Sequence, residues 1–243
     1  MENNILCCVF NHNDNEKSSM WADRLSPHFE TVILDSGSSP ACSHPLSVTL
    51  PNIYYSGLMN KAYELLCEKN YRWLMIVTSD IEIDDKHTER LVAAMKEISK
   101  TTNVALYQPS CRISFRGRAL HQSCCHFTGR IRKVNFQEGW FHLASREVLE
   151  DVLPMNAELN KFGWGIDLAL CHYARIRNML ILVDDRVRVL HPKGTGYNKE
   201  TALLQMRMWH KTLPGYTSPR HFRPSKDPIR YESSLLYYNK NAG

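Results

Sequence analysis

The sequence contains no apolar run approaching the roughly 20 residues that a helix needs to cross a bilayer. The apolar stretch near its start, residues 5–10, is also shorter than the apolar core of a signal peptide. Its eight cysteines include no C-x-x-C pair, which argues against a zinc knuckle, and disulfides are rare in proteins that are not secreted. We therefore predict a cytoplasmic protein with free, buried thiols.

Glycine-rich phosphate loops are missing as well. No G-x-G-x-x-G pattern occurs, so the dinucleotide-binding fingerprint is absent. The polar stretch 11–15, which follows the first apolar run, contains no glycine, and this disfavours a nucleotidyltransferase. Internal repeats and low-complexity tracts are also absent. A chain of 243 residues with ordinary apolar content is predicted to fold as one large domain or two small ones.

The net charge of +5 conceals a segregation of charge along the chain. Residues 112–133 carry six Lys/Arg and no acid, and residues 206–231 carry six Lys/Arg against one acid. The rest of the chain is acidic, with 18 basic and 24 acidic residues. Such basic segments suit phosphate groups, an anionic membrane or nucleic acid, while plain solubility is the alternative. No nucleic-acid-binding module accompanies them, so we expect no nucleic-acid partner.

A short apolar run, residues 73–77, is followed at once by acidic residues, among them Asp80 and Glu82. The run reads as a strand buried on both faces, and ligands of open α/β sheets collect at the carboxyl ends of such strands. In an extended segment Asp80 and Glu82 project to the same side. Two like charges about 4 Å apart repel by roughly 4 kcal/mol at an effective dielectric near 20, which a divalent cation would offset. The alternative is a solvated turn that caps the helix beginning near Lys86.

Strands and helices alternate as far as residue 108, in the order βαβαβαβ, which favours a parallel, doubly wound sheet. The strands are predicted at 5–10, 31–34, 73–77 and 104–108, the last of them closed by Pro109. The second strand runs into Asp35, placed to face the ribose or base of a nucleotide, although a turn or N-cap role is the alternative. Beyond Pro109 the pattern is irregular: strands are predicted at 138–143, 179–183 and 187–190, and helices near 145–152, 168–174 and 199–211.

Six motifs occur in a fixed order between residues 4 and 197. They are V-I-L-D-S-G-S-S (32–39), N-I-Y-Y-S-G-L-M-N-K-A-Y (52–63), S-D-I-E-I (79–83), E-G-W-F-H-L-A-S-R-E-V-L (138–149), G-W-G-I-D-L (163–168) and the loop that begins at His191. In this order they resemble the nucleotide-sugar-dependent glycosyltransferases of the GT-A fold, especially the inverting bacterial family 2 enzymes that build polysaccharides. S-D-I-E-I is then a variant of the family's DXD motif.

The resemblance implies an α/β fold of GT-A type. It comprises a Rossmann-like, mostly parallel sheet with helices on both faces and a smaller mixed sheet on the acceptor side. Residues 1–200 would form a single domain, with a nucleotide-binding half (1–110) and an acceptor-side half (111–200). Residues 201–243 would add a C-terminal helix and a basic, proline-containing tail. That tail is predicted to be irregular, packed by its aromatic residues, and placed near an anionic surface or simply over the sheet.

The resemblance also implies roles for individual residues. Asp167 matches the general base, although the Glu that precedes the family's Asp is missing here, and a structural role is the alternative. The ion would be Mn²⁺ or Mg²⁺, and imidazole suits Mn²⁺ better. The metal ligands would be Asp80, Glu82 and His191. The nucleotide would be bound by Asn11, Asp35, Asn60, Ser79 and Lys193. The acceptor or the sugar would contact Glu138, Trp140 and Trp164.

The implied function is metal-dependent, inverting transfer of a sugar from a nucleoside-diphosphate sugar, UDP favoured, to a glycan or lipid-linked acceptor. A cytoplasmic enzyme of this kind could also contact the inner membrane leaflet through its basic tail. Two alternatives stay open. One is a catalytically inactive nucleotide-sugar-binding protein, which the missing Glu before Asp167 supports, and the other is the less favoured nucleotidyltransferase.

Overall fold

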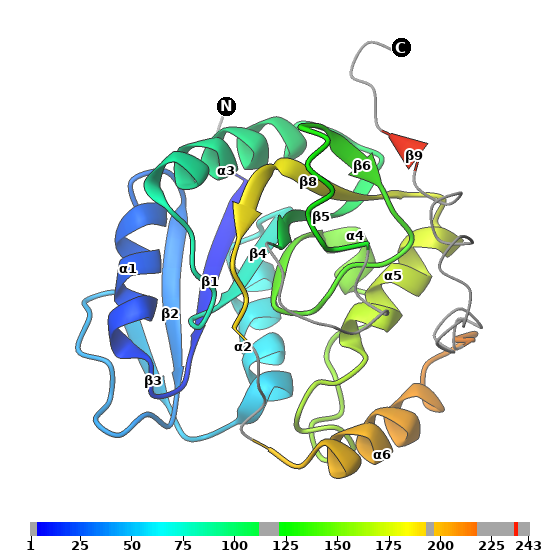
Figure 1. Cartoon of the computed structure of the whole chain (residues 1–243). Helices are drawn as coiled ribbons and strands as arrows, with labels where there is room; N and C mark the ends of the chain where they lie inside the picture. The colour runs from blue at the N-terminus through cyan, green and yellow to red at the C-terminus, as the bar shows by residue number, and fades with distance from the viewer. Residues whose placement is uncertain (1–3, 112–121, 193–196, 218–235, 238–243) are drawn as a thin grey trace.

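A computed structural model of the chain describes residues 4–111, 122–192, 197–217 and 236–237. Strands and helices alternate through the first half (Figure 1). These elements are β1 (Ile5–Asn11), α1 (Asn15–Leu25), β2 (Glu30–Ser36), β3 (Ser47–Leu50), α2 (Tyr54–Glu68), β4 (Trp73–Thr78), α3 (Asp85–Ile98) and β5 (Val104–Cys111). The second half contains β6 (Ile131–Lys133), β7 (Phe141–Ser145), α4 (Arg146–Leu149), α5 (Ile166–Ile176), β8 (Leu180–Val189), α6 (Lys199–His210) and β9 (Leu236–Tyr237).

The described strands form one sheet in the order β3-β2-β1-β4-β7-β5-β8-β6-β9. Strands β3, β2, β1 and β4 are mutually parallel, as predicted for the first half. Strand β7 is inserted antiparallel between β4 and β5, and β5 then pairs in parallel with β8. The α/β class with a Rossmann-like sheet is therefore confirmed. The mixed part continues the parallel part within the same sheet.

Both faces of the sheet are buried under helices. Along β1, Leu6, Cys8 and Phe10 join the apolar cluster beneath α2, α4 and α5, while the alternate residues join the cluster beneath α1 and α3. This alternation explains why the strand reads as a continuous apolar run. Burying each large side chain contributes about 1.5–3 kcal/mol relative to leaving it exposed. The prediction of helices on both faces is confirmed.

Several predicted boundaries differ from those in the structure. Helix α2 begins at Tyr54 and is preceded by β3, which was not among the predicted strands. The two strands predicted at 179–183 and 187–190 are one strand, β8. Pro109 lies inside β5, where the register with β8 shifts between Pro109 and Ser110. A proline is tolerated at such an irregularity because one ladder hydrogen bond is already missing there.

Helix α6 belongs to the same core as α5. Its Trp209 is fully buried in the cluster that includes Leu170, and Met206, Leu213 and Tyr216 pack against that cluster. The helix predicted near 199–211 is thus present as α6, and the described aromatic residues that follow the predicted start of the tail, up to Tyr216, pack on the body. The remainder of the tail, and the basic residues 112–121, lie outside the described residues. No helix in the part of the chain described is both long and apolar enough to cross a membrane.

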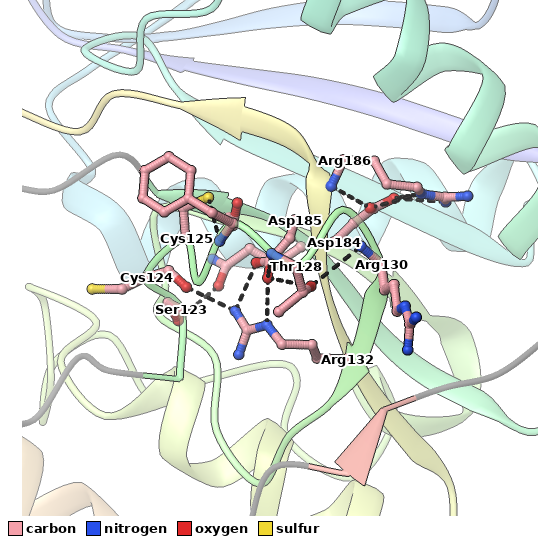
Figure 2. A network of polar contacts seen from close by, with 12 residues as sticks. Ser123, Cys124, Cys125, Thr128, Arg130, Arg132, Asp184, Asp185 and Arg186 are labelled. Carbon is pink, nitrogen blue, oxygen red and sulfur yellow. Dashed lines mark hydrogen bonds and ion pairs between the residues drawn. The ribbon is translucent and has the colours of Figure 1, made fainter. Parts of the chain in front are cut away.

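A buried ion pair joins β6 to β8 (Figure 2). Arg132 and Asp185 are both inaccessible, and Nε and one terminal nitrogen of Arg132 donate to the two carboxylate oxygens of Asp185, each at 3.0 Å. Arg132 also donates to the Cys124 carbonyl at 2.7 Å, and the Thr128 hydroxyl donates to Asp185 at 2.7 Å. These contacts fix the turn before β6 against β8.

We expect Arg132→Met to lower the free energy of unfolding by about 3–5 kcal/mol, because the Asp185 charge would stay buried without its partner. Urea titration followed by circular dichroism measures the loss. The control is Arg146→Met, since Arg146 pairs with Glu150 on the exposed surface of a helix, where such pairs contribute about 0.2–1 kcal/mol. Equal, small losses in both variants would contradict the prediction.

Candidate active site at the carboxyl end of β4

The chain turns sharply where β4 ends. Ser79 donates its backbone N–H to Phe10 at 2.9 Å, and Asp80 follows at the rim. Glu82 and Leu190 then pair through two backbone hydrogen bonds of 2.9 and 2.8 Å. This short bridge brings the segment after β8 beside the segment after β4. As a result, His191 Nε2 lies 3.5 Å from Asp80 Oδ2.

The electrostatics of Asp80 suit a cation. Burial raises the pKa of Asp80, but hydrogen bonds with His191, with Thr78 and with the backbone, together with the charge of His191, leave the net pKa lowered. Its other oxygen, Oδ1, is inaccessible and has no hydrogen-bond partner among the residues described. A buried carboxylate oxygen without a donor calls for an explanation, and an ion is one. Carboxylate and imidazole together form a donor set that Mn²⁺ accepts.

Glu82 does not join this pair. Its carboxylate is exposed and accepts a hydrogen bond from Lys17 Nζ at 3.2 Å. Within the described ranges, no three His, Cys, Asp or Glu side chains are grouped so that they could hold a metal. The predicted three-ligand set is therefore not assembled. The prediction assumed an extended segment, whereas the chain turns at Thr78, whose carbonyl accepts from Ile81 at 3.1 Å.

The start of β7 forms the next wall of the site. Trp140 is buried, its ring centroid lies 5.5 Å from that of His191, and its Nε1 donates to Glu138 at 3.0 Å. Burial raises the pKa of Glu138. The predicted stacking of Trp140 on a sugar is not supported by this geometry, because the indole is enclosed beside the imidazole. Glu138, in contrast, lies within the candidate site.

Asp167 lies at the first turn of α5, behind Gly165. Gly165 has a φ of 81°, in the left-handed region that glycine adopts without strain. Asp167 Oδ1 accepts the Leu168 backbone N–H at 2.8 Å. Burial raises the pKa of Asp167 to about 7, and the charge of Glu138 adds to the rise. A carboxylate that titrates near neutrality can accept a proton at physiological pH.

The predicted nucleotide-binding residues are mostly engaged within the protein. Asp35 is inaccessible and accepts hydrogen bonds from Asn11 Nδ2 at 3.0 Å, from the Cys42 N–H at 2.8 Å and from the Ser38 hydroxyl. Asn11 and Asp35 thus lie at the ends of adjacent strands, as predicted, but their side chains hold the loops after β1 and β2 together. A direct contact of Asp35 with ribose or base does not fit this arrangement.

Asn60 is a clear correction. Its Nδ2 donates to the Met155 carbonyl at 2.9 Å, and its Oδ1 accepts from the Met155 N–H at 2.7 Å. The side chain therefore ties α2 to the loop after α4, through one donated and one accepted hydrogen bond. Ser79 is buried at the strand end, beside the candidate metal pair. Lys193 lies outside the described residues.

No protein-family model matches the sequence, and no curated protein matches it either. Solved structures do match. They include a mycobacterial protein (16% identity, covering 83% of this chain and 70% of the other, TM-score 0.52). Another is GalNAc-T7 with UDP, GalNAc and Mn²⁺ (13% identity, covering 79% of this chain and 43% of the other, TM-score 0.56). A third is glucosyl-3-phosphoglycerate synthase from Mycobacterium tuberculosis with Mn²⁺, UDP and glucosyl-3-phosphoglycerate (15% identity, covering 84% of this chain and 76% of the other, TM-score 0.50). The chain has the GT-A fold.

The GT-A fold predicted from the six ordered motifs is thereby confirmed. In this GT-A chain, an aromatic cluster that the sequence did not predict borders Asp167. Trp164 Nε1 donates to the Tyr197 hydroxyl at 2.6 Å, and the rings of Phe162 and Tyr197 stack with centroids 4.5 Å apart. Trp164 is half-buried, so part of its indole remains accessible. The signal available in sequence was the density of aromatic residues around the two glycines of the G-W-G-I-D-L motif.

Proposed function

We propose that this chain transfers a sugar from a nucleoside-diphosphate sugar, UDP favoured, to a glycan or lipid-linked acceptor, with inversion at the transferred carbon. The observation that carries the proposal is the pairing of Asp80 with His191 at the same end of the sheet as Asp167. The GT-A fold supports it, and so do the UDP and Mn²⁺ held by the two named structural relatives. The polysaccharide-building role implied by the motifs remains part of this proposal.

Asp80 and His191 would hold the metal ion, with Mn²⁺ favoured over Mg²⁺ because imidazole is a ligand. The unpartnered, inaccessible Oδ1 of Asp80 fits this role. When bound, the ion would neutralise charge on the diphosphate as it leaves. Ser79 lies beside this pair, and we propose that it and Lys193 contact the diphosphate. Asn11 and Asp35 would shape the donor pocket indirectly, by holding together the loops after β1 and β2.

Asp167 would take the proton from the acceptor hydroxyl as that oxygen attacks the sugar. A pKa near 7 leaves the carboxylate ionised in a large fraction of molecules at neutral pH and still basic enough to accept the proton. Burial also raises the pKa of Glu138, the neighbouring carboxyl group on this wall of the site. The accessible part of Trp164 would receive the acceptor ring.

A second candidate function is nucleotide-sugar binding without turnover. The specific observation in its favour is that Glu82 turns to Lys17, which leaves two side chains, Asp80 and His191, for the metal. A weakly held ion would still support binding of the donor while contributing less to catalysis.

A thermal-shift panel of UDP- and GDP-sugars with and without Mn²⁺ tests the function. A donor at about 100 times its dissociation constant should stabilise the protein by about 2.7 kcal/mol, only when Mn²⁺ is present. Release of nucleoside diphosphate in the presence of acceptors then separates the candidates. A shift with diphosphate release supports the transferase, whereas a shift without release supports the binder. Absence of any shift would contradict both.

The basic tail is proposed to attach the protein to anionic membranes. Each cation near such a surface contributes about 1 kcal/mol, so changing Arg220, Arg223, Lys226 and Arg230 to Gln should weaken vesicle binding by about 10²- to 10³-fold. Sedimentation with phosphatidylserine vesicles at low salt measures this, and neutral vesicles serve as the control. If the unaltered protein stays in the supernatant with anionic vesicles, the tail has no membrane role.

A further inference from the structure

A hollow of about 700 Å³ lies between α3 and β8, and its described lining includes none of the residues assigned above to the candidate active site. Its walls include Arg90 and Glu97 of α3, Phe127 and Gly129 of the turn before β6, and Arg186 and Arg188 of β8. Ligand pockets for small molecules have volumes of about 300–1,000 Å³. The size and the three guanidinium groups raise the question of an anionic ligand.

Two of the three arginines keep most of their donors available. Arg188 uses its Nε on His87 at 3.2 Å, and Arg90 uses one terminal nitrogen on the Arg186 carbonyl at 3.3 Å. Neither forms an ion pair with a carboxylate of the described residues. A guanidinium carries five N–H donors in a planar fork that matches the oxygens of phosphate. Among the described residues, these two side chains therefore keep donors that no carboxylate accepts, although the charge of Arg188 also acts on Asp84.

The acidic groups of the hollow are largely neutralised. Asp185 is paired with Arg132. Asp184, which is not among the described lining residues, accepts hydrogen bonds from Arg186 at 2.8 to 3.2 Å. Glu97 is the other carboxylate of the lining residues described, and its charge acts on Arg186. The described lining therefore contains three guanidinium groups and two carboxylates, so its formal charge is positive.

Phe127 supplies an apolar surface at the same place. Its side chain is 74% exposed, although large aromatic residues are normally buried. Its φ is 54°, a left-handed conformation that is unusual for a bulky residue. The Arg188 guanidinium carbon lies 5.8 Å from the centre of the ring. An exposed aromatic ring beside a cation is the arrangement that binds a flat ring carrying a negative group.

The network in Figure 2 ties the turn before β6 to β8. The Phe127 N–H donates to Cys125 Sγ at 3.4 Å, and the Arg130 N–H donates to the Thr128 hydroxyl at 3.2 Å. The Thr128 hydroxyl in turn donates a hydrogen bond to the buried Asp185. The turn that carries Phe127 is thereby fastened to the same bulge of β8 that carries Arg186. A preformed site loses less conformational entropy when a ligand binds.

We propose that this hollow is a second ligand site, which binds a small molecule with a phosphate group attached to a ring. Arg90 and Arg188 bind the phosphate, and Phe127 covers one face of the ring. The ring can belong to a sugar phosphate or to a nucleotide, and the shared chemistry is the phosphate beside a flat or apolar ring face. The site does not depend on the metal pair, so it stands or falls separately from the proposed glycosyl transfer.

Calorimetry without divalent metal tests the proposal with three probes: inorganic phosphate, glucose 6-phosphate and UMP. Arg90→Gln and Arg188→Gln should each weaken binding of the ring-bearing probe by about ten-fold, because each removes a charge-assisted hydrogen bond. Phe127→Ala should weaken that probe by several-fold and leave inorganic phosphate unchanged. Tighter binding of glucose 6-phosphate than of UMP identifies a sugar phosphate as the ligand, and the reverse identifies a nucleotide.

Lys96→Gln is the matched control, since Lys96 is an exposed cation on α3 outside the hollow. The affinity of this variant for the ring-bearing probe should equal that of the unaltered protein. Asp80→Ala should also leave metal-free binding unchanged, which separates this site from the donor site. Unaltered melting temperatures exclude misfolding of the arginine variants. The proposal is overturned if the protein binds no probe at about 1 mM. Equal affinity in the Arg90→Gln/Arg188→Gln double variant, or loss of binding in Asp80→Ala, overturns it as well.

Discussion

Replacing Asp167 by asparagine is expected to lower kcat by about 10²- to 10⁴-fold with donor affinity nearly unchanged, because a general base acts in the transition state. Asparagine keeps the shape of the side chain, and its oxygen can still accept the Leu168 N–H that Asp167 Oδ1 accepts at 2.8 Å. The variant therefore removes the proton acceptor alone. Single-turnover kinetics and calorimetry with UDP measure the two quantities separately.

The pH dependence gives an independent signature of the same residue. Because burial raises the pKa of Asp167 to about 7, kcat/KM should rise with pH and level off above about pH 7. The folded protein also holds this proton at pH values where the unfolded chain has released it. Asp167 consequently lowers stability as pH rises from its ordinary pKa towards 7. Asp167→Asn should thus be more stable than the unaltered protein at about pH 8 and equally stable near pH 3.

The exposed Asp23 provides the control, and Asp23→Asn should change neither turnover nor the position of the pH limb. Near-normal turnover in Asp167→Asn would assign Asp167 to a structural role at the start of α5. In that case Glu138, the other carboxylate of this wall with a raised pKa, becomes the candidate base.

The sequence was most informative where contacts follow the order of the chain. Strands β1, β2 and β4 are separated by helices, so apolar runs and their turns were enough to predict a parallel sheet. The position of β7 could not be predicted in this way. It arrives some 60 residues after β4 and pairs with it antiparallel, Val77 opposite Phe141. Nothing local in either strand selects that partner.

The candidate site shows the same division at the level of single residues. Asp80 and His191, which the family resemblance assigned to one metal site, lie 3.5 Å apart, because both follow strands at one edge of the sheet. Glu82 and Asn60 were not placed correctly, since a carboxylate or an amide serves equally well as a ligand or as a partner for Lys17 or a backbone group. Only the fold decides between these uses. Tyr197 and Phe162 were missed because their stacking joins segments far apart in the chain.

The metal pair gives the second large expected effect, and the structure changes what is expected of Glu82. Asp80→Ala and His191→Ala should each weaken Mn²⁺-dependent UDP binding by about 100-fold or more. Removing a residue that only hydrogen-bonds to a metal ligand typically weakens metal binding by about 10- to 100-fold. Glu82→Ala should change it by less than about two-fold, because the exposed carboxylate pairs with Lys17 at 3.2 Å, outside the pair.

Calorimetry with UDP at fixed Mn²⁺, repeated with EDTA, measures all three variants against one metal-free baseline. Melting temperatures should stay close to that of the unaltered protein, since Asp80 and His191 lie beyond the ends of their strands. If Glu82→Ala loses as much affinity as Asp80→Ala, Glu82 leaves Lys17 and joins the ion when the nucleotide binds. The three-ligand set predicted from the S-D-I-E-I motif would then form only in the complex. If none of the three variants loses affinity, the end of β4 is not the metal site.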